Sequence, residues 1–168
     1  MKSEIQLAFE KCRKENRPAL ISYTVSSDPN KKKFFKILKS ISTHIDLAEI
    51  GFPFSTPIGD GSDIQTSSYR AIKNGFKMRD LFQLVKEYKK TNSSKPIILM
   101  GYYNMIFNYG ENKFLKDCKK SRVSGIICVD LPWPENKNFA KKCKNKSINF
   151  IQLLAPTTTK DRMKKIIR

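Results

Sequence analysis

Apolar positions along this chain alternate between two spacings, one typical of β-strands and one typical of α-helices. Short β-rich runs occur at residues 19–25, 45–50, 96–101, 125–129 and 149–154. Between these runs, apolar residues recur at intervals of three and four, which predicts amphipathic helices that each bury one face. We expect these helices at residues 34–41, 64–73, 78–88, 112–120 and 135–144, with a last one starting after residue 157.

Another amphipathic helix is predicted before the first strand, because Ile5, Ala8, Phe9 and Cys12 share one helical face. The chain therefore reads as one leading helix and five strand–helix units, the last of them incomplete. No linker or shift in composition divides it, which predicts a single domain over residues 1–168. In the turn after the first strand, the Asp of Asp28-Pro29 is expected to cap the next helix.

Strands that are apolar on both faces and separated by helices indicate a parallel sheet covered by helices, hence an α/β protein. No Gly-x-Gly-x-x-Gly follows the first strand, which argues against a doubly wound dinucleotide-binding sheet. Polar residues instead follow successive strands, where a (β/α)8 TIM barrel has its active site. The sequence predicts such a barrel, incomplete here because it needs eight strands, and therefore the N-terminal part of a longer protein. The polar residues are Glu49, Asp60, Tyr102, Asn104 and Asp130.

The net charge of +18 and the isoelectric point of 9.9 are typical of nucleic-acid-binding proteins. Here, however, the lysines are spread over nearly every predicted helix, opposite its apolar stripe, and no zinc-finger or RNA-binding signature occurs. We interpret them as solvated helix faces, with no nucleic-acid partner. A broadly positive field would still attract a phosphorylated, anionic substrate.

The remaining composition indicates a cytoplasmic protein without a membrane segment. No apolar run approaches the ~20 residues of a membrane-spanning helix, and the N-terminus does not resemble a signal peptide. The four cysteines form no C-x-x-C pair and are expected to be reduced and to pack as small apolar groups. The single histidine, His44, lies away from other ligand residues, so we predict no metal site and no cofactor in this chain.

Residues 46–65 hold the strongest candidates for chemistry. On a strand, Leu47 and Glu49 share a face, so an inward Leu47 means an inward Glu49. Burial would raise the pKa of this carboxyl and suit it to proton transfer near neutral pH. A stiff loop rich in proline and glycine then displays Asp60. The plainer alternative is a surface carboxylate at position 49 and a helix cap at position 60, and composition alone favours it.

The order of residues within 46–65 favours the catalytic interpretation over this alternative. The segment resembles the signature of the tryptophan synthase α subunit, L-E-(L/I)-G-x-P-(F/Y)-S-D-P-x-A-D-G-P-x-I-Q. Weaker motifs follow in the family's order over essentially the whole chain. Residues 102–110 resemble its Y-x-N-x-(I/V)-x-x-x-G loop, residues 130–132 its D-(L/V)-P, and residues 155–158 its A-P-(T/N)-(T/S).

The resemblance implies a lyase of tryptophan biosynthesis that splits indole-3-glycerol phosphate into indole and glyceraldehyde 3-phosphate by a retro-aldol reaction. By this resemblance Glu49 is the general acid and base, and Asp60 accepts a hydrogen bond from the indole N–H. The apolar slot for the ring would be lined by Tyr102, Met100, Ile127, Val129 and Leu153.

The resemblance also implies a partner, a β subunit that carries pyridoxal phosphate and forms an α2β2 heterotetramer with this subunit. The surface facing it would include Pro53, Thr56, Pro57, Asn104 and Phe107.

Three residues depart from the family pattern, which has Asp at Thr56, Ala at Gly59 and Gly at Ser27. The change at Thr56 brings communication between subunits into question. The family's phosphate-binding loops follow later strands, so residues 1–168 alone are not expected to turn over substrate. The alternative is a truncated, inactive barrel fragment that at most binds the β subunit.

Overall fold

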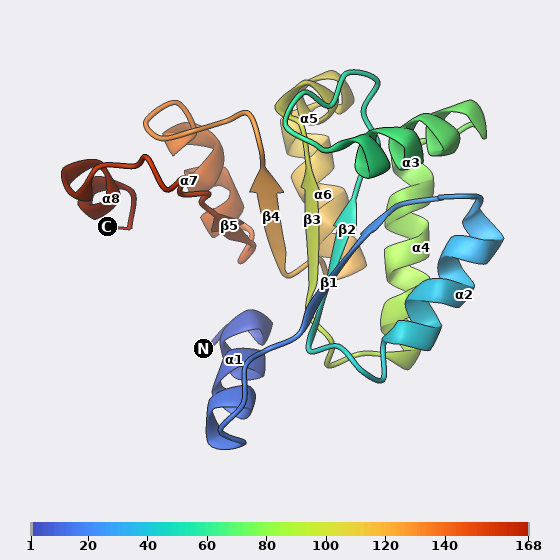
Figure 1. Ribbon diagram of the computed structural model, residues 1–168, viewed down its shortest axis with the longest axis horizontal. Helices are drawn as coiled ribbons and strands as arrows, with labels where there is room; N and C mark the ends of the chain where they lie inside the picture. Colours follow the sequence, from blue (N-terminus) through green and yellow to red (C-terminus); the bar gives the residue numbers. More distant parts are fainter. Residues whose placement is uncertain (1, 168) are drawn as a thin grey trace.

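Five parallel strands form one sheet, in the order in which they occur in the chain, in a computed structural model that describes residues 2–167 (Figure 1). The middle strands each pair with both of their neighbours in sequence. In the register of the sheet, Glu49 lies between Tyr23 and Ile98. The strands are β1 (Ile21–Val25), β2 (Leu47–Gly51), β3 (Ile97–Gly101), β4 (Gly125–Cys128) and β5 (Asn149–Ile151).

The helices lie between these strands, apart from the first, which precedes β1, and the last, which follows β5. They are α1 (Glu4–Lys14), α2 (Lys31–Ile41), α3 (Ser62–Lys73), α4 (Met78–Thr91), α5 (Tyr103–Tyr109), α6 (Glu111–Ser121), α7 (Lys137–Asn145) and α8 (Lys160–Ile166). The sequence did not predict α5, because seven residues are too few to show a helical period. Its start is stabilised by Asp130, which accepts a hydrogen bond of 2.7 Å from the backbone N–H of Tyr103.

Side-chain alternation divides the sheet into two apolar faces. One face carries the larger part of the core and packs against α2, α4, α6 and α7. Its strand residues are Ala48, Ile50, Ile97, Leu99, Ile126 and Cys128. On the other face, Leu47, Ile98 and Ile127 form a smaller cluster, against which Ile5 and Ala8 of α1 pack. Figure 1 shows α1 below the amino ends of the strands, where it covers one end of this inner face.

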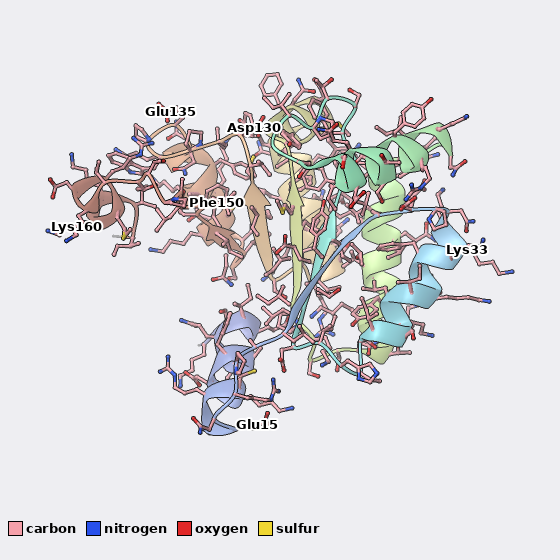
Figure 2. All side chains as sticks on the ribbon, viewed as in Figure 1. Glu15, Lys33, Asp130, Glu135, Phe150 and Lys160 are labelled. Carbon is pink, nitrogen blue, oxygen red and sulfur yellow. The ribbon has the colours of Figure 1, made fainter. Side chains whose placement is uncertain are left out.

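This arrangement confirms the incomplete (β/α)8 barrel. In a doubly wound sheet the strand order reverses at a switch point, whereas here it follows the chain from β1 to β5. Lys33 on α2 and Lys160 on α8 lie at opposite sides of the molecule (Figure 2), in keeping with the dispersed lysines of the sequence. Within residues 2–167, no helix combines the length and apolar character needed to cross a membrane.

The prediction that Asp28 caps the helix after β1 is wrong. Asn30 is the cap of α2, and its side chain accepts a hydrogen bond of 3.0 Å from the backbone N–H of Lys33. Asp28 instead accepts hydrogen bonds from the Arg70 guanidinium, at 2.7 and 2.8 Å, and from the Ser67 hydroxyl. Because Arg70 and Ser67 lie on α3, this carboxylate joins the β1–α2 turn to α3.

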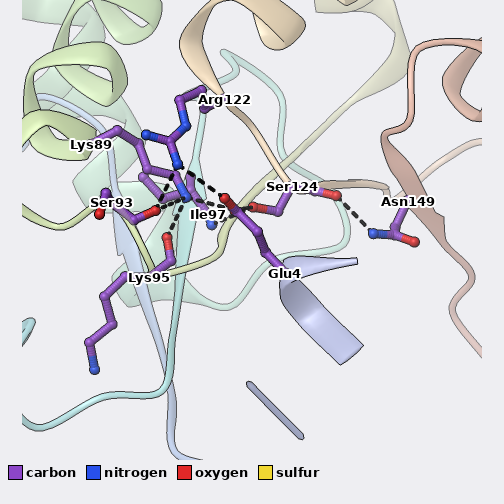
Figure 3. A network of polar contacts seen from close by, with 8 residues as sticks. All are labelled: Glu4, Lys89, Ser93, Lys95, Ile97, Arg122, Ser124 and Asn149. Atoms are coloured by element: carbon purple, nitrogen blue, oxygen red, sulfur yellow. Dashed lines mark hydrogen bonds and ion pairs between the residues drawn. The ribbon is translucent and has the colours of Figure 1, made fainter. Parts of the chain in front are cut away.

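A buried polar network fastens α1 to the amino ends of β3 and β4 (Figure 3). The side chain of Lys89 is only 2% exposed, and its ammonium lies 2.7 Å from the Glu4 carboxylate and 2.6 Å from the Lys95 carbonyl. The hydroxyl of Ser124 donates to Glu4 at 2.6 Å and accepts from the backbone N–H of Ile97 at 3.2 Å. A buried ammonium without such acceptors would be costly, so Glu4 couples the leading helix to the stability of the sheet.

Glu4→Ala is therefore expected to lower the free energy of unfolding by about 1–3 kcal/mol, because the buried ammonium and hydroxyl lose a charged acceptor. The matched control is Glu10→Ala on the same helix, which removes an exposed ion pair with Lys2 and should cost under about 0.5 kcal/mol. Denaturant unfolding of both variants measures the difference. Equal losses would contradict the role given to the network.

Candidate active site

Glu49 lies on the inner face of β2, two residues beyond Leu47 of the inner apolar cluster. It is half-buried, and burial raises the pKa of its carboxyl. Desolvation disfavours the charged form of a carboxyl group. The geometry thus gives this strand position a group that holds a proton at higher pH than an ordinary glutamate.

Asp60 lies on the loop between β2 and α3 and is held by Tyr102, which follows β3. The Tyr102 hydroxyl donates to the Asp60 carboxylate at 3.1 Å and accepts from the backbone N–H of Gly59 at 2.9 Å. Phe54 stacks on the Tyr102 ring at 5.0 Å between centroids. These contacts fold the loop over the carboxyl end of the sheet. The cap of α3 is Gly61, so Asp60 is not the helix cap of the plainer alternative.

The residues predicted to line the apolar slot differ in position, and one of them, Leu153, is exposed. Met100 and Ile127 are directly opposite each other in the sheet register and belong to the inner face. Val129 follows β4 and lies against the loop, since a Cβ on Gly59 would be 3.2 Å from it. Leu153, in contrast, is 52% exposed. The prediction that the fifth strand continues to residue 154 is wrong: β5 ends at Ile151, opposite Ile127 of β4.

The predicted partner-facing residues differ in exposure. Thr56, Asn104 and Phe107 are exposed, with Phe107 at 67%, whereas Pro57 is half-buried and Pro53 is buried. Ile58, which sequence reasoning did not single out, is 85% exposed on the same loop as Thr56. The sequence signal for this residue was an isoleucine between Pro57 and Gly59, a turn in which a large apolar side chain is unusual.

Sequence reasoning also missed Tyr23. This residue lies opposite Glu49 on β1, and its hydroxyl would be 2.1 Å from a Cβ on Gly51. Burial, followed by the charges of Asp60 and Glu49, raises the pKa of its phenol. The signal was the alternation of the first strand, which places Tyr23 on the same face as Glu49 once the strands are parallel and in register.

Fold and site together define a class: a (β/α)-barrel protein with a partly buried carboxyl and a second acid at the carboxyl ends of its strands. Comparison with known proteins narrows that class to one family. The family model described as "Tryptophan synthase alpha chain" matches residues 9–168. The chain belongs to this family, as its motifs predicted.

Curated relatives and solved structures agree with this assignment. The tryptophan synthase alpha chain of Pelagibacter ubique is 62% identical over 166 residues, covering 99% of this chain and 63% of the relative. A solved alpha subunit from Legionella pneumophila has a TM-score of 0.93 at 29% identity, over 98% of this chain and 63% of that one. A chain of the tryptophan synthase complex of Pyrococcus furiosus has a TM-score of 0.84 at 43% identity, and the match covers 88% of this chain and 61% of that one. The chain thus spans about three fifths of the length of the relatives it matches.

Gly51 admits the Tyr23 phenol into the site, so Gly51→Ala is expected to force that ring aside. The overpacking should lower the free energy of unfolding by up to about 3 kcal/mol, and Tyr23→Ala in the same chain should remove most of this added cost. The control is Gly61→Ala, whose Cβ meets nothing within 4 Å; its cost should stay under about 1 kcal/mol. Thermal or denaturant unfolding measures these losses. If the losses of Gly51→Ala and Tyr23→Ala simply add in the double variant, the contact between the two residues is contradicted.

The raised pKa of Glu49 predicts a stability that depends on pH. The folded protein holds this proton to higher pH than the unfolded chain, so stability falls as pH rises from the ordinary glutamate range through the raised pKa. Glu49→Gln should therefore raise the free energy of unfolding at about pH 7 and lose that advantage near pH 4, where the carboxyl is protonated. Glu87→Gln, at an exposed position of α4, is the control and should show no such difference. A destabilised Glu49→Gln variant at neutral pH would refute the assignment.

Proposed function

We propose that this chain carries the acid–base groups of a lyase that cleaves indole-3-glycerol phosphate to indole and glyceraldehyde 3-phosphate. The observation that supports this most is the position of Glu49, half-buried beside the inner apolar cluster, with burial raising its pKa. A group of this kind can give a proton and take one back near neutral pH. In the protein the reaction would serve tryptophan biosynthesis, in the cytoplasm.

Two proton transfers by Glu49 account for the reaction. The protonated carboxyl first delivers its proton to the ring carbon that bears the side chain, and the ring nitrogen becomes cationic. The carboxylate that remains then takes the proton of the adjacent hydroxyl. The carbon–carbon bond breaks, its electron pair returns to the ring, and the hydroxyl carbon becomes the aldehyde.

Asp60 stabilises the cationic intermediate by accepting a hydrogen bond from the ring N–H. Its hydrogen bond with Tyr102 supports this role, because a carboxylate held at one end of a rigid loop needs little rearrangement to meet the ring. Met100, Ile127 and Val129 supply apolar surface for the indole, with Leu153 at the exposed margin. The phosphate would be attracted by the positive field of a chain with net charge +18.

The proposed partner is a β subunit that carries pyridoxal phosphate and consumes the indole. The Pyrococcus furiosus relative is described as part of an α2β2 complex, which supports the same assembly here. The exposed side chains of Thr56, Asn104 and Phe107 form the proposed contact surface, with Pro53 and Pro57 shaping the loop. Thr56 lacks the charge of the family's acid, so we propose that communication between subunits is altered rather than proton transfer.

A second candidate is a fragment that binds the β subunit without catalysis. The observation that favours it is Thr56, a neutral residue where the family signature has an acid. It accounts for the exposed loop residues but assigns no purpose to the burial of Glu49 or to the bonded Asp60. We therefore rank it second.

A fusion separates the two candidates. Residues 1–168 joined to the part of the Pelagibacter ubique relative that follows the matched region should release indole from indole-3-glycerol phosphate. Glu49→Gln in this fusion should lower kcat by about a hundredfold or more, because general acid and base catalysis are both lost. Glu10→Gln, on α1 at the opposite end of the strands, should leave kcat unchanged.

Residues 1–168 by themselves should release no indole in the same assay. Indole release by these residues that Glu49→Gln abolishes would contradict that expectation. A fusion that folds but stays inactive would favour the second candidate instead.

A further inference from the structure

The hydroxyl of Tyr23 occupies the place of a missing side chain next to Glu49. Residues 49 and 51 follow each other on the inner face of β2, with their Cβ positions roughly 7 Å apart. At position 51 there is only hydrogen, and the Tyr23 hydroxyl lies 2.1 Å from where a Cβ would be. The phenol thus crosses from β1, where Tyr23 is paired with Glu49, to the next inward position of β2.

The hydroxyl of Tyr23 differs from that of Tyr102 in its hydrogen bonds. Within residues 2–167 it forms no hydrogen bond to the protein, whereas the nearby Tyr102 hydroxyl makes two, to Gly59 and to Asp60. Tyr23 is half-buried, and burial, followed by the charges of Asp60 and Glu49, raises the pKa of its phenol, so it keeps its proton at neutral pH. Among the described residues, this O–H group is therefore a donor without an acceptor.

The proposed reaction needs a donor at this place. When Glu49 takes the proton of the substrate hydroxyl, negative charge grows on that oxygen until the carbon–carbon bond breaks and the carbonyl forms. Donors already in position where such charge develops lower the barrier most, because they need not reorganise. Asp60 and Glu49 are acids and cannot serve as this donor in their ionised forms.

We propose that Tyr23 is a catalytic residue whose hydroxyl donates a hydrogen bond to the substrate oxygen that Glu49 deprotonates. This inference rests on the proposed lyase function and adds to it an oxyanion donor supplied by β1. The proton of the substrate hydroxyl goes to Glu49, the bond electrons return to the indole ring, and the phenol keeps its own proton throughout. Gly51 is required because any side chain there would displace the phenol.

Tyr23→Phe tests the donor without emptying the space. In the fusion described above, it should lower kcat roughly tenfold with little change in KM, because the hydrogen bond strengthens as charge develops. Tyr69→Phe on α3, whose side chain is exposed, is the matched control and should match the parent. Equal melting temperatures of parent and variants establish that the fold is intact.

A binding measurement on the full 168-residue chain keeps the test independent of turnover. Calorimetry compares 3-methylindole with indole-3-methanol, which differs from it by one hydroxyl on the carbon attached to the ring. The parent should prefer the alcohol roughly fivefold, and Tyr23→Phe should bind the two alike.

The outcomes separate the two proposals. A Tyr23→Phe variant that equals the parent in both kcat and ligand preference would overturn the donor role and leave the lyase function standing. An inactive parent fusion, with a preference for the alcohol that Tyr23→Phe removes, would overturn the reaction and retain the donor. Loss of kcat and of preference together supports both.

Discussion

The position of Glu49 in the parallel pairing of β2 is the constraint on which the rest of the site depends. Alternation sends Ala48 and Ile50 into the main core and leaves Glu49 on the opposite face with Leu47. The buried outer residues fix the register, because a slip of one residue would send the carboxyl into the helix layer. A charged group is thereby kept in a desolvated place by apolar contacts on the other side of the same strand.

The second acid is positioned in a different way, by a loop and not by a strand. The Tyr102 hydroxyl joins Asp60 and the Gly59 amide, and Phe54 covers the tyrosine ring. Tyr102 directly follows β3, so its hydrogen bonds fix the position of the β2–α3 loop relative to the next strand of the sheet. Glu49 and Asp60 are eleven positions apart in sequence and are positioned by contacts with different neighbouring strands, β1 beside Glu49 and the residue after β3 beside Asp60.

The bonded polar network and the proposed catalytic groups lie at opposite ends of the strands. At the amino ends, Glu4, Lys89 and Ser124 form a fully bonded polar network that fastens α1 (Figure 3). At the carboxyl ends, Glu49 is desolvated, and the Tyr23 hydroxyl has no hydrogen-bond partner in the part of the chain that the structure describes. Desolvation of Glu49 costs stability at neutral pH, and the buried apolar faces of the sheet offset that cost.

The sequence by itself determined the order of the strands, the parallel barrel class and the family, because these depend on periodicity and on an ordered local motif; the same motif proposes the two acids. It missed α5, assigned the cap of α2 to Asp28, and extended the fifth strand beyond Ile151, since short elements and caps depend on neighbours such as Asp130 and Arg70. Only the tertiary structure decided that Tyr102 binds Asp60 and that Tyr23 crosses to Gly51. Those contacts join strands more than twenty residues apart, and their geometry depends on the register and twist of the sheet, which no local pattern encodes.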